Sequence, residues 1–326
     1  MPIVDKSAYR PIAAFKNCHF HTIYPSLFRT IRGVTFSRER ISTPDDDFLD
    51  LDWARHGSTR LILTIHGLEG SSRSRYIPGM IKAFARRGWD GVALNLRGCS
   101  GEPNRLLRSY HSGATDDVET VITHILTHYP AYREIALIGF SLGGCLTLNY
   151  LGERGSSLPE EMLGAAAVST PCDLATSAER LSEAGNTMYL KNFLRCFRKK
   201  IRLKMRQMPD KISDRNFHEV TSLKIFDDRY TAPIHGFRNA EDYWARCSPK
   251  RLLAGIHIPT LLLNALDDPF LAEASYPLKE AASHPYLFLE MPDFGGHVGF
   301  MARRPDGEYW HETRICDFVQ TLTTHS

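Results

Sequence analysis

The sequence predicts an α/β fold with a mostly parallel central sheet, helices on both faces of that sheet, and an inserted, mainly helical segment. From residue 60 onward, short runs of Val, Ile and Leu alternate with amphipathic stretches, as in a chain of alternating strands and helices. The runs do not alternate apolar with polar residues, which indicates strands that are buried on both faces. One gap of about 90 residues between two runs is too long for a single crossover helix and indicates an insertion.

The individual elements follow from these patterns in chain order. Residues 33–54 predict two strands around a turn at Thr43-Pro44-Asp45. Buried strands are predicted at residues 60–65, 91–96, 134–139, 163–168, 259–265 and 286–291. Helices are predicted between them at residues 73–87, 114–128 and 142–154. We expect a single domain over residues 1–326, because a chain of this length can bury a large core.

The insertion is expected at approximately residues 172–246. Its stretch 190–208 carries apolar residues at helical spacing: Leu190, Phe193, Leu194, Phe197, Ile201, Met205 and Met208. The other face of this helix is basic and comprises Arg195, Arg198, Lys199, Lys200, Arg202, Lys204 and Arg206. The pattern favours a helix packed on one side and solvated on the other. The alternative is a basic 195–206 face that makes a weak peripheral contact with an anionic membrane or binds an anionic substrate.

Composition argues against several classes of function. The 40 Lys and Arg residues against 37 Asp and Glu give a net charge of +3, which does not favour nucleic acid as a partner. The seven cysteines are scattered and include no C-x-x-C pair, which disfavours a disulfide framework or a structural zinc site and fits a reducing compartment. No apolar signal-peptide core is visible, and no apolar run approaches the ~20 residues of a membrane span. We therefore expect a cytoplasmic protein.

A candidate nucleophile lies in the motif Gly-Phe-Ser-Leu-Gly at residues 139–143. This G-x-S-x-G pattern directly follows the predicted strand 134–139 and directly precedes the predicted helix 142–154. Strand, sharp turn and helix are the context in which such a motif projects a serine above the edge of a sheet. Small neighbours are needed at such a turn, and Gly139 and Gly143 meet that need. Ser141 is therefore the candidate nucleophile.

A serine hydroxyl needs a base to take its proton, and the base needs an acid to orient it. In folds with this motif, the acid and then the histidine follow the serine in the chain. Asp267 and Asp268 follow the predicted strand 259–265, and His297 follows the strand 286–291 after a Gly-Gly pair. Asp268 precedes a proline, which gives it a separate role as a helix N-cap. We therefore predict His297 as the base and Asp267, rather than Asp268, as the acid.

Two backbone amides are needed to stabilise the negative charge that develops during attack on a carbonyl. One is predicted to be the amide of Leu142, the residue after the nucleophile. The other is predicted in the loop His66-Gly67-Leu68-Glu69-Gly70 after the strand 60–65, with Leu68 as the donor. A Gly-rich turn before a helix is the structural interpretation of that loop, and both interpretations are compatible.

Together these residues resemble the α/β-hydrolase superfamily, and in particular its YheT-like branch of esterases. Further similar stretches are residues 17–22, 66–72, 97–104, 110–113, 267–270 and 295–300, so the resemblance covers nearly the whole chain. On this resemblance, Ser141, Asp267 and His297 fall on the catalytic triad, and the insertion corresponds to a cap. The resemblance implies hydrolysis of carboxylic esters without a metal or organic cofactor.

The predicted function is that of a serine hydrolase which cleaves short- to medium-chain acyl esters or acylglycerols through an acyl-enzyme intermediate. The first alternative is an acyltransferase that passes the acyl group to an alcohol with the same triad. The second is a non-catalytic module that keeps the fold for binding. Acyl-chain length is set by the packing of the cap, which the sequence does not reveal.

Overall fold

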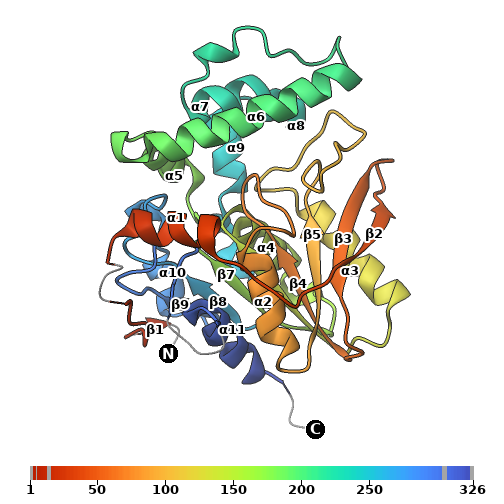
Figure 1. Ribbon diagram of the computed structural model, residues 1–326, viewed down its shortest axis with the longest axis vertical. Helices are drawn as coiled ribbons and strands as arrows, with labels where there is room; N and C mark the ends of the chain where they lie inside the picture. Colours follow the sequence, from red (N-terminus) through yellow and green to blue (C-terminus); the bar gives the residue numbers. More distant parts are fainter. Residues whose placement is uncertain (1–2, 5, 13–15, 303–306, 324–326) are drawn as a thin grey trace.

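The computed structural model describes residues 3–4, 6–12, 16–302 and 307–323, so the first two and last three residues of the predicted domain lie outside it. Within these ranges, the chain forms a nine-stranded sheet with the strand order β1-β9-β8-β7-β6-β4-β5-β3-β2. Helices cover both faces of the sheet, and further helices rise above one edge (Figure 1). This arrangement confirms the predicted fold class.

The described strands lie close to their predicted positions, except for the first, which the sequence did not predict. They are β1 (Ile3–Val4), β2 (Ser37–Ser42), β3 (Phe48–Ala54), β4 (Arg60–Ile65), β5 (Asp90–Asn95), β6 (Glu134–Phe140), β7 (Met162–Val168), β8 (Thr260–Leu263) and β9 (Leu287–Glu290). The pairs β2–β3 and β3–β5 are antiparallel, and the other neighbouring pairs are parallel. The two strands predicted at residues 33–54 are confirmed as a hairpin, whereas β8 and β9 are shorter than expected.

The continuous apolar runs arise because each strand feeds two hydrophobic clusters. On β4, Leu61, Leu63 and Ile65 belong to one cluster and Ile62 to the other. Helices α3 (Thr115–His128), α4 (Leu142–Arg154) and α10 (Leu278–Ala282) pack on the first face. Helices α2 (Tyr76–Ala85) and α11 (Trp310–Gln320) pack on the second. Successive side chains of a strand point to opposite faces, so both must be apolar here.

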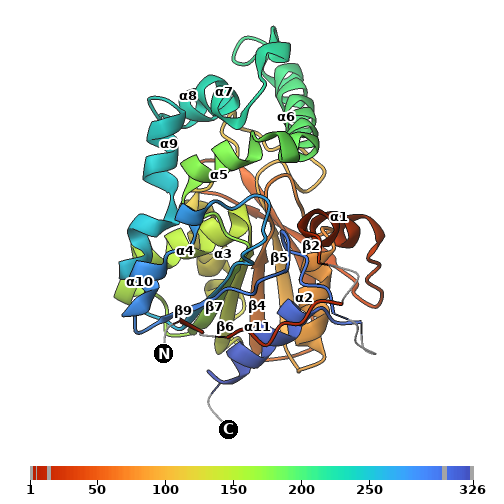
Figure 2. The ribbon, with the colours of Figure 1, turned by 90° about the vertical axis from the view of Figure 1, so that its left-hand side faces the viewer.

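The sequence patterns did not predict the N-terminal helix α1 (Cys18–Phe28). This helix contains Pro25, and its outward face carries the exposed aromatic rings of Phe20 and Phe28. A proline and an apolar outer face both weaken the usual signs of an amphipathic helix. In Figures 1 and 2, α1 lies at the side of the sheet, below the inserted helices.

The segment between β7 and β8, expected at approximately 172–246, rises as a helical layer above the carboxyl ends of the parallel strands (Figures 1 and 2). Its elements are α5 (Leu174–Leu181), α6 (Thr187–Gln207), α7 (Leu223–Phe226), a π-helical turn (Asp227–Thr231), α8 (Ala232–His235) and α9 (Ala240–Cys247). We call residues 174–247 the cap.

The basic face of α6, which the sequence predicted to be solvated, is partly buried in the structure. Lys204 is buried, and its Nζ donates hydrogen bonds to the carbonyl oxygens of Asn104 and Leu106. Lys200 also turns inward, with its Nζ 2.8 Å from Oε1 of Glu69. Both lysines tie the cap to the loops below it because a buried ammonium group must find acceptors. The remaining exposed cations include Arg195, Lys199, Arg202 and Arg206.

Helix α6, with 21 residues, is long enough to cross a bilayer but is not apolar enough. In the described part of the chain, no helix is both long and apolar enough to do so. All seven cysteines lie in the described ranges and carry free thiols.

Candidate active site

Ser141 occupies the sharp turn between β6 and α4. Its backbone has φ 54° and ψ −118°, a conformation that L-residues rarely adopt. A Cβ at Gly139 would lie 2.2 Å from the carbonyl oxygen of Gly143, and one at Gly143 would lie 2.3 Å from that of Ile65. The two glycines of the motif are therefore required for the turn to form, as expected for a nucleophile elbow.

His297 connects this serine to an aspartate. Its Nε2 lies 2.9 Å from Oγ of Ser141, and its Nδ1 lies 2.9 Å and 3.1 Å from the two carboxylate oxygens of Asp268. Asp268 is 2% exposed, so the imidazole has a buried carboxylate behind it and the serine hydroxyl in front. With Nδ1–H donating to Asp268, Nε2 is left free to accept the serine proton.

The choice of Asp267 as the acid is wrong, because the structure pairs His297 with Asp268 instead. Oδ1 of Asp267 accepts a hydrogen bond of 2.9 Å from the amide of Gly296 and thereby holds the turn before His297. Burial raises the pKa of Asp267 to about 6. The role of Asp268 as a helix N-cap is also wrong, because no helix begins directly after it and its Oδ1 accepts the amide of Phe270 within a turn. Its carboxylate has lone pairs left for the imidazole.

Helix α1 helps to hold the loop that carries His297. The amide of His297 donates to Oγ1 of Thr22 over 2.9 Å, and the next amide, of Val298, donates to Oγ of Ser169 over 2.9 Å. A Cβ at Gly296 would lie 2.6 Å from the carbonyl oxygen of Cys18, so the loop packs directly on α1. Sequence reasoning missed Thr22, and only the similarity of residues 17–22 to the YheT-like branch pointed to this stretch.

The loop that contains Leu68 passes directly beside the serine. A Cβ at Gly67 would lie 3.0 Å from Cβ of Ser141, and the amide of Gly67 donates to the hydroxyl of Tyr76. Leu68 and Leu142 both line the cavity in front of Ser141. The structure thus brings together Ser141, His297 and both predicted oxyanion residues.

His66 anchors the start of this loop. Its Nε2 accepts a hydrogen bond from the amide of Leu96, so in the neutral ring the proton sits on Nδ1, 2.8 Å from the carbonyl oxygen of Gly67. Burial lowers the pKa of His66 to about 4 and keeps this tautomer uncharged near neutral pH. His66 therefore has a structural role that fixes the backbone next to Leu68.

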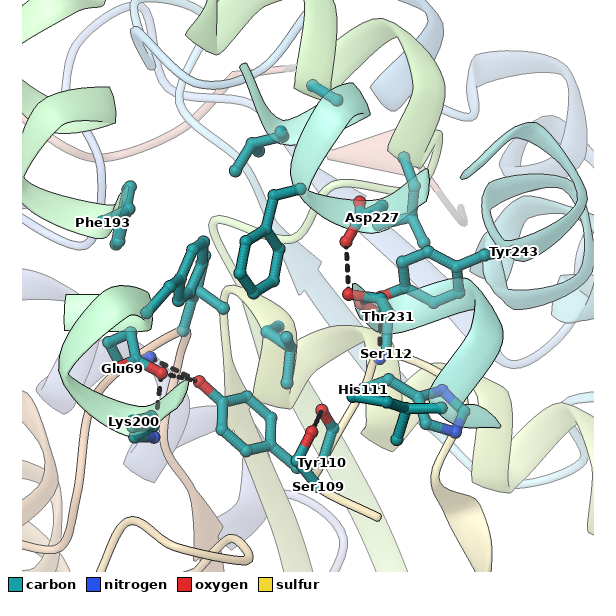
Figure 3. Close-up of a pocket in the computed structure, with 18 of the residues that line it drawn as sticks. Glu69, Ser109, Tyr110, His111, Ser112, Phe193, Lys200, Asp227, Thr231 and Tyr243 are labelled. Atoms are coloured by element: carbon teal, nitrogen blue, oxygen red, sulfur yellow. Dashed lines mark hydrogen bonds and ion pairs between the residues drawn. The ribbon is translucent and has the colours of Figure 1, made fainter. Parts of the chain in front are cut away.

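Glu69 links the same loop to the cap (Figure 3). Its Oε1 accepts a hydrogen bond of 2.6 Å from the hydroxyl of Tyr110 and lies 2.8 Å from Nζ of Lys200. The amide of Glu69 in turn donates to the hydroxyl of Tyr110. Glu69 has φ 56°, so this side chain holds an uncommon backbone conformation immediately after Leu68. Lys200 Nζ also lies 3.0 Å from Sγ of Cys99, a partner that the sequence did not reveal. Burial raises the pKa of the Cys99 thiol, which favours its neutral form.

Two cavities meet at Ser141. The first, which we call the cap cavity, lies between the sheet and the cap, and its apolar lining includes Leu174, Phe197, Ile201, Leu223, Phe226 and Ile234. The second, which we call the α1 cavity, is lined by α1, by residues 73–76 and by Tyr189 of α6. Both cavities share Leu68, Ser141, Phe193, Phe270 and His297.

The far wall of the cap cavity carries polar groups that the protein itself satisfies (Figure 3). Asp227 accepts from the hydroxyl of Thr231 over 2.6 Å and from Nε1 of Trp244 over 2.9 Å, and burial raises its pKa to about 6. Burial lowers the pKa of His111 to about 3, so this ring is neutral. Within the described residues, no group of three or more His, Cys, Asp or Glu side chains is placed to hold a metal ion.

Comparison with known proteins places this geometry in a family. A family model described as "alpha/beta hydrolase fold" matches residues 60–303. The chain belongs to the α/β-hydrolase family. This α/β-hydrolase is 35% identical over 325 residues to "Putative esterase YheT" of Escherichia coli (strain K12), covering 97% of this chain and 94% of that protein. It is 31% identical over 339 residues to "Phospholipase ABHD3" of Homo sapiens, covering 99% and 81% of the two chains.

Among solved structures, an esterase of Pyrococcus furiosus aligns with a TM-score of 0.60 at 18% identity, covering 89% of this chain and 92% of that one. At this identity, the match supports the fold alone. Together, the comparisons confirm that the chain is an α/β-hydrolase of the YheT-like branch. They also confirm the expectation of a hydrolase of the esterase type.

Proposed function

We propose that this α/β-hydrolase is a serine esterase that uses Ser141, His297 and Asp268 as its catalytic triad. The observation that carries the proposal is the continuous chain of hydrogen bonds from Asp268 through His297 to Ser141. Oγ of Ser141 attacks the ester carbonyl while Nε2 of His297 takes its proton. The buried Asp268 carboxylate orients the imidazole and stabilises its charged form.

The intermediate then collapses and releases the alcohol. The amides of Leu68 and Leu142 hold the oxyanion as the carbonyl carbon becomes tetrahedral. The bond to the leaving alcohol breaks, His297 gives the alcohol its proton, and the acyl group stays on Ser141. A water molecule, deprotonated by His297, releases the acid and restores the serine.

The apolar lining of the cap cavity supports a substrate with an acyl chain of short to medium length, as in simple acyl esters or acylglycerols. Side chains of α5, α6 and α7 lie above Ser141 with few charges that are not already paired. Relatives named esterase and phospholipase agree with ester substrates. A reducing, cytoplasmic compartment is part of the same proposal, in keeping with the seven free cysteines.

A weak peripheral contact with anionic membranes remains part of the proposal, but on fewer residues. Arg198 and Arg202 both pair with Asp214, which leaves Arg195, Lys199 and Arg206 as the exposed cations of the 195–206 face that have no described carboxylate partner. Cosedimentation with vesicles containing anionic lipid is expected to weaken when these three are replaced by Gln. Equal sedimentation with neutral and anionic vesicles would remove this contact from the proposal.

The test of the proposed function is labelling with a fluorophosphonate, a reagent that reacts with activated serines, followed by mapping of the adduct by mass spectrometry. We expect a single adduct on Ser141, no adduct in Ser141→Ala, and hydrolysis of 4-nitrophenyl butyrate by the wild type only. A folded protein that neither labels nor hydrolyses would overturn the esterase proposal and favour a binding module. Transfer of the acyl group to added glycerol in place of water would favour the acyltransferase.

A further inference from the structure

The α1 cavity begins at the same serine as the cap cavity, so the two can receive the two halves of one ester. An ester joins its acyl chain and its alcohol at the carbonyl carbon that Ser141 attacks. The cap cavity is apolar and suits the acyl chain, as argued for the proposed function on which this inference rests. The α1 cavity is then left for the alcohol that departs.

The α1 cavity is lined by basic side chains and by no acidic ones among the described residues. The basic side chains include three arginines, Arg29, Arg73 and Arg75. Arg29 is already neutralised, because its two NH groups each lie 2.7 Å from an oxygen of the buried Glu312. The charge that faces the cavity therefore comes from Arg73 and Arg75.

Neither of these two guanidinium groups has a described carboxylate within ion-pair distance, and both residues are exposed. The acidic side chains nearby are already engaged. Glu69 is held by Lys200 and Tyr110, and Asp52 pairs with Arg38 and accepts a hydrogen bond from Ser72. The positive charge at this rim is thus not balanced by the loops around it.

The backbone that carries the two arginines is fixed, although their side chains are exposed. The amide of Ser72 donates to Oδ1 of Asn95. The amide of Ser74 donates to the carbonyl oxygen of Ser71, and the amide of Ser71 donates to Oγ of Ser74, which closes a turn around Arg73. The hydroxyl of Tyr76, at the start of α2, accepts a hydrogen bond from the amide of Gly67 in the loop that contains Leu68. The arginines therefore project from a short segment anchored beside the nucleophile.

We propose that the α1 cavity is a leaving-group subsite for an alcohol that carries a phosphate, with Arg73 and Arg75 as its specificity-determining residues. A guanidinium group presents two parallel N–H donors that match two phosphate oxygens. The phosphate takes no part in bond breaking. Ser141 forms its bond to the carbonyl carbon, the bond from that carbon to the alcohol oxygen breaks, and His297 protonates the alcohol, which leaves with its phosphate intact.

The test uses two esters that differ only in this group, 1-hexanoylglycerol and 1-hexanoylglycerol 3-phosphate, at low ionic strength. We expect the wild type to prefer the phosphate ester in kcat/KM. The double variant Arg73→Gln/Arg75→Gln is expected to lose about tenfold or more on the phosphate ester, the usual scale for a charged hydrogen bond, and to stay within about twofold on the neutral ester.

The matched control is Lys199→Gln/Arg206→Gln, which removes the same net charge from exposed positions of α6. Equal losses in both double variants would mean long-range attraction and would overturn the subsite. Absence of any preference in the wild type would overturn it as well. A preference for the monomeric hexanoyl ester points to a soluble phosphate ester, whereas a preference found only with long-chain esters in neutral detergent micelles points to a lipid headgroup.

A second measurement separates this inference from the esterase proposal. If neither ester is cleaved, glycerol 3-phosphate is expected to slow fluorophosphonate labelling of Ser141 in the wild type more than in the arginine variant. If glycerol 3-phosphate does not change the rate of labelling in either protein, the subsite is overturned, even if the serine itself proves reactive.

Discussion

The two cavities that meet at Ser141 differ in whether the charged side chains that line them are paired within the protein. In the cap cavity, Arg97 pairs with Asp117, Lys204 donates to two carbonyl oxygens, and Asp227 accepts from two side chains. In the α1 cavity, Arg73 has no described carboxylate partner, and neither does Arg75. A charge left unpaired in the interior costs several kcal/mol, so buried charges are paired when the chain folds. Charges at a solvated rim carry no such penalty and remain available to a ligand.

The largest effect is expected at the catalytic residues where the two cavities meet, from substitution of one or the other of two neighbouring aspartates. Asp268→Asn is expected to lower kcat on 4-nitrophenyl butyrate by about 10⁴-fold, since an amide favours the wrong tautomer of His297. Asp267→Asn keeps the hydrogen bond acceptor for Gly296 and is expected to stay within a few-fold of wild type. Steady-state rates of both variants check this, and a large loss in Asp267→Asn alone would restore the sequence-based choice.

The assignment of the acyl chain to the cap cavity can be tested by filling that cavity. Leu223 of α7 lines it, and Leu223→Trp is expected to lower kcat/KM on 4-nitrophenyl octanoate by about 10- to 100-fold, with little effect on the acetate. The control is Ile225→Trp, on the same short helix but exposed to solvent and outside the lining. A uniform loss over all chain lengths in Leu223→Trp would place the acyl chain elsewhere.

Loss of the contact between the cap and the loop that contains Leu68 is expected to lower kcat by a smaller factor. Lys200→Met removes the cation that holds Glu69 next to Leu68, and we expect kcat to fall about tenfold with KM little changed, as for a weakened oxyanion contact. Lys200→Arg is expected to recover most of the rate, while Lys199→Met, on the exposed face, leaves it unchanged. Equal losses in kcat for the Met and Arg variants at position 200 would contradict a positioning role.

The smallest effect concerns stability rather than rate. Burial raises the pKa of Asp227 in the folded protein to about 6, above its value in the unfolded chain. A raised pKa means that this group favours folding below the unfolded pKa and that this contribution is lost as the pH rises through about 6. The melting temperature of Asp227→Asn relative to wild type is therefore expected to rise between pH 5 and pH 8, as measured by circular dichroism. A difference that is constant with pH would mean that Asp227 does not titrate in this range.

The sheet and the nucleophile were predictable because their signals are local. A buried parallel strand is a continuous apolar run, and the turn at Ser141 needs glycines at fixed positions. Asp268 was not predictable, because its role depends on which of two adjacent carboxylates faces a loop 29 residues further along the chain. Thr22 and Lys200 act on residues that are 275 and 131 positions away, and neither residue type marks such a contact in the sequence.

The α1 cavity was also beyond sequence reasoning, for the same physical reason. It is assembled from an N-terminal helix, the loop after β4, the cap and the His297 loop, so no single segment carries its pattern. The cap cavity, by contrast, takes most of its apolar lining from one insertion, where the helical spacing of Phe193, Phe197 and Ile201 was visible.

The most direct test of the account is a crystal structure of the adduct that Ser141 forms with the ethyl ester of hexylphosphonofluoridic acid. The phosphorus stands in for the tetrahedral carbon, the hexyl group for the acyl chain and the ethoxy group for the leaving alcohol. We predict the hexyl chain in the cap cavity beside Phe197 and Leu223, and the ethoxy group directed into the α1 cavity toward Arg73 and Arg75. A hexyl chain in the α1 cavity, with the ethoxy group under the cap, would contradict the division of the ester between the two cavities.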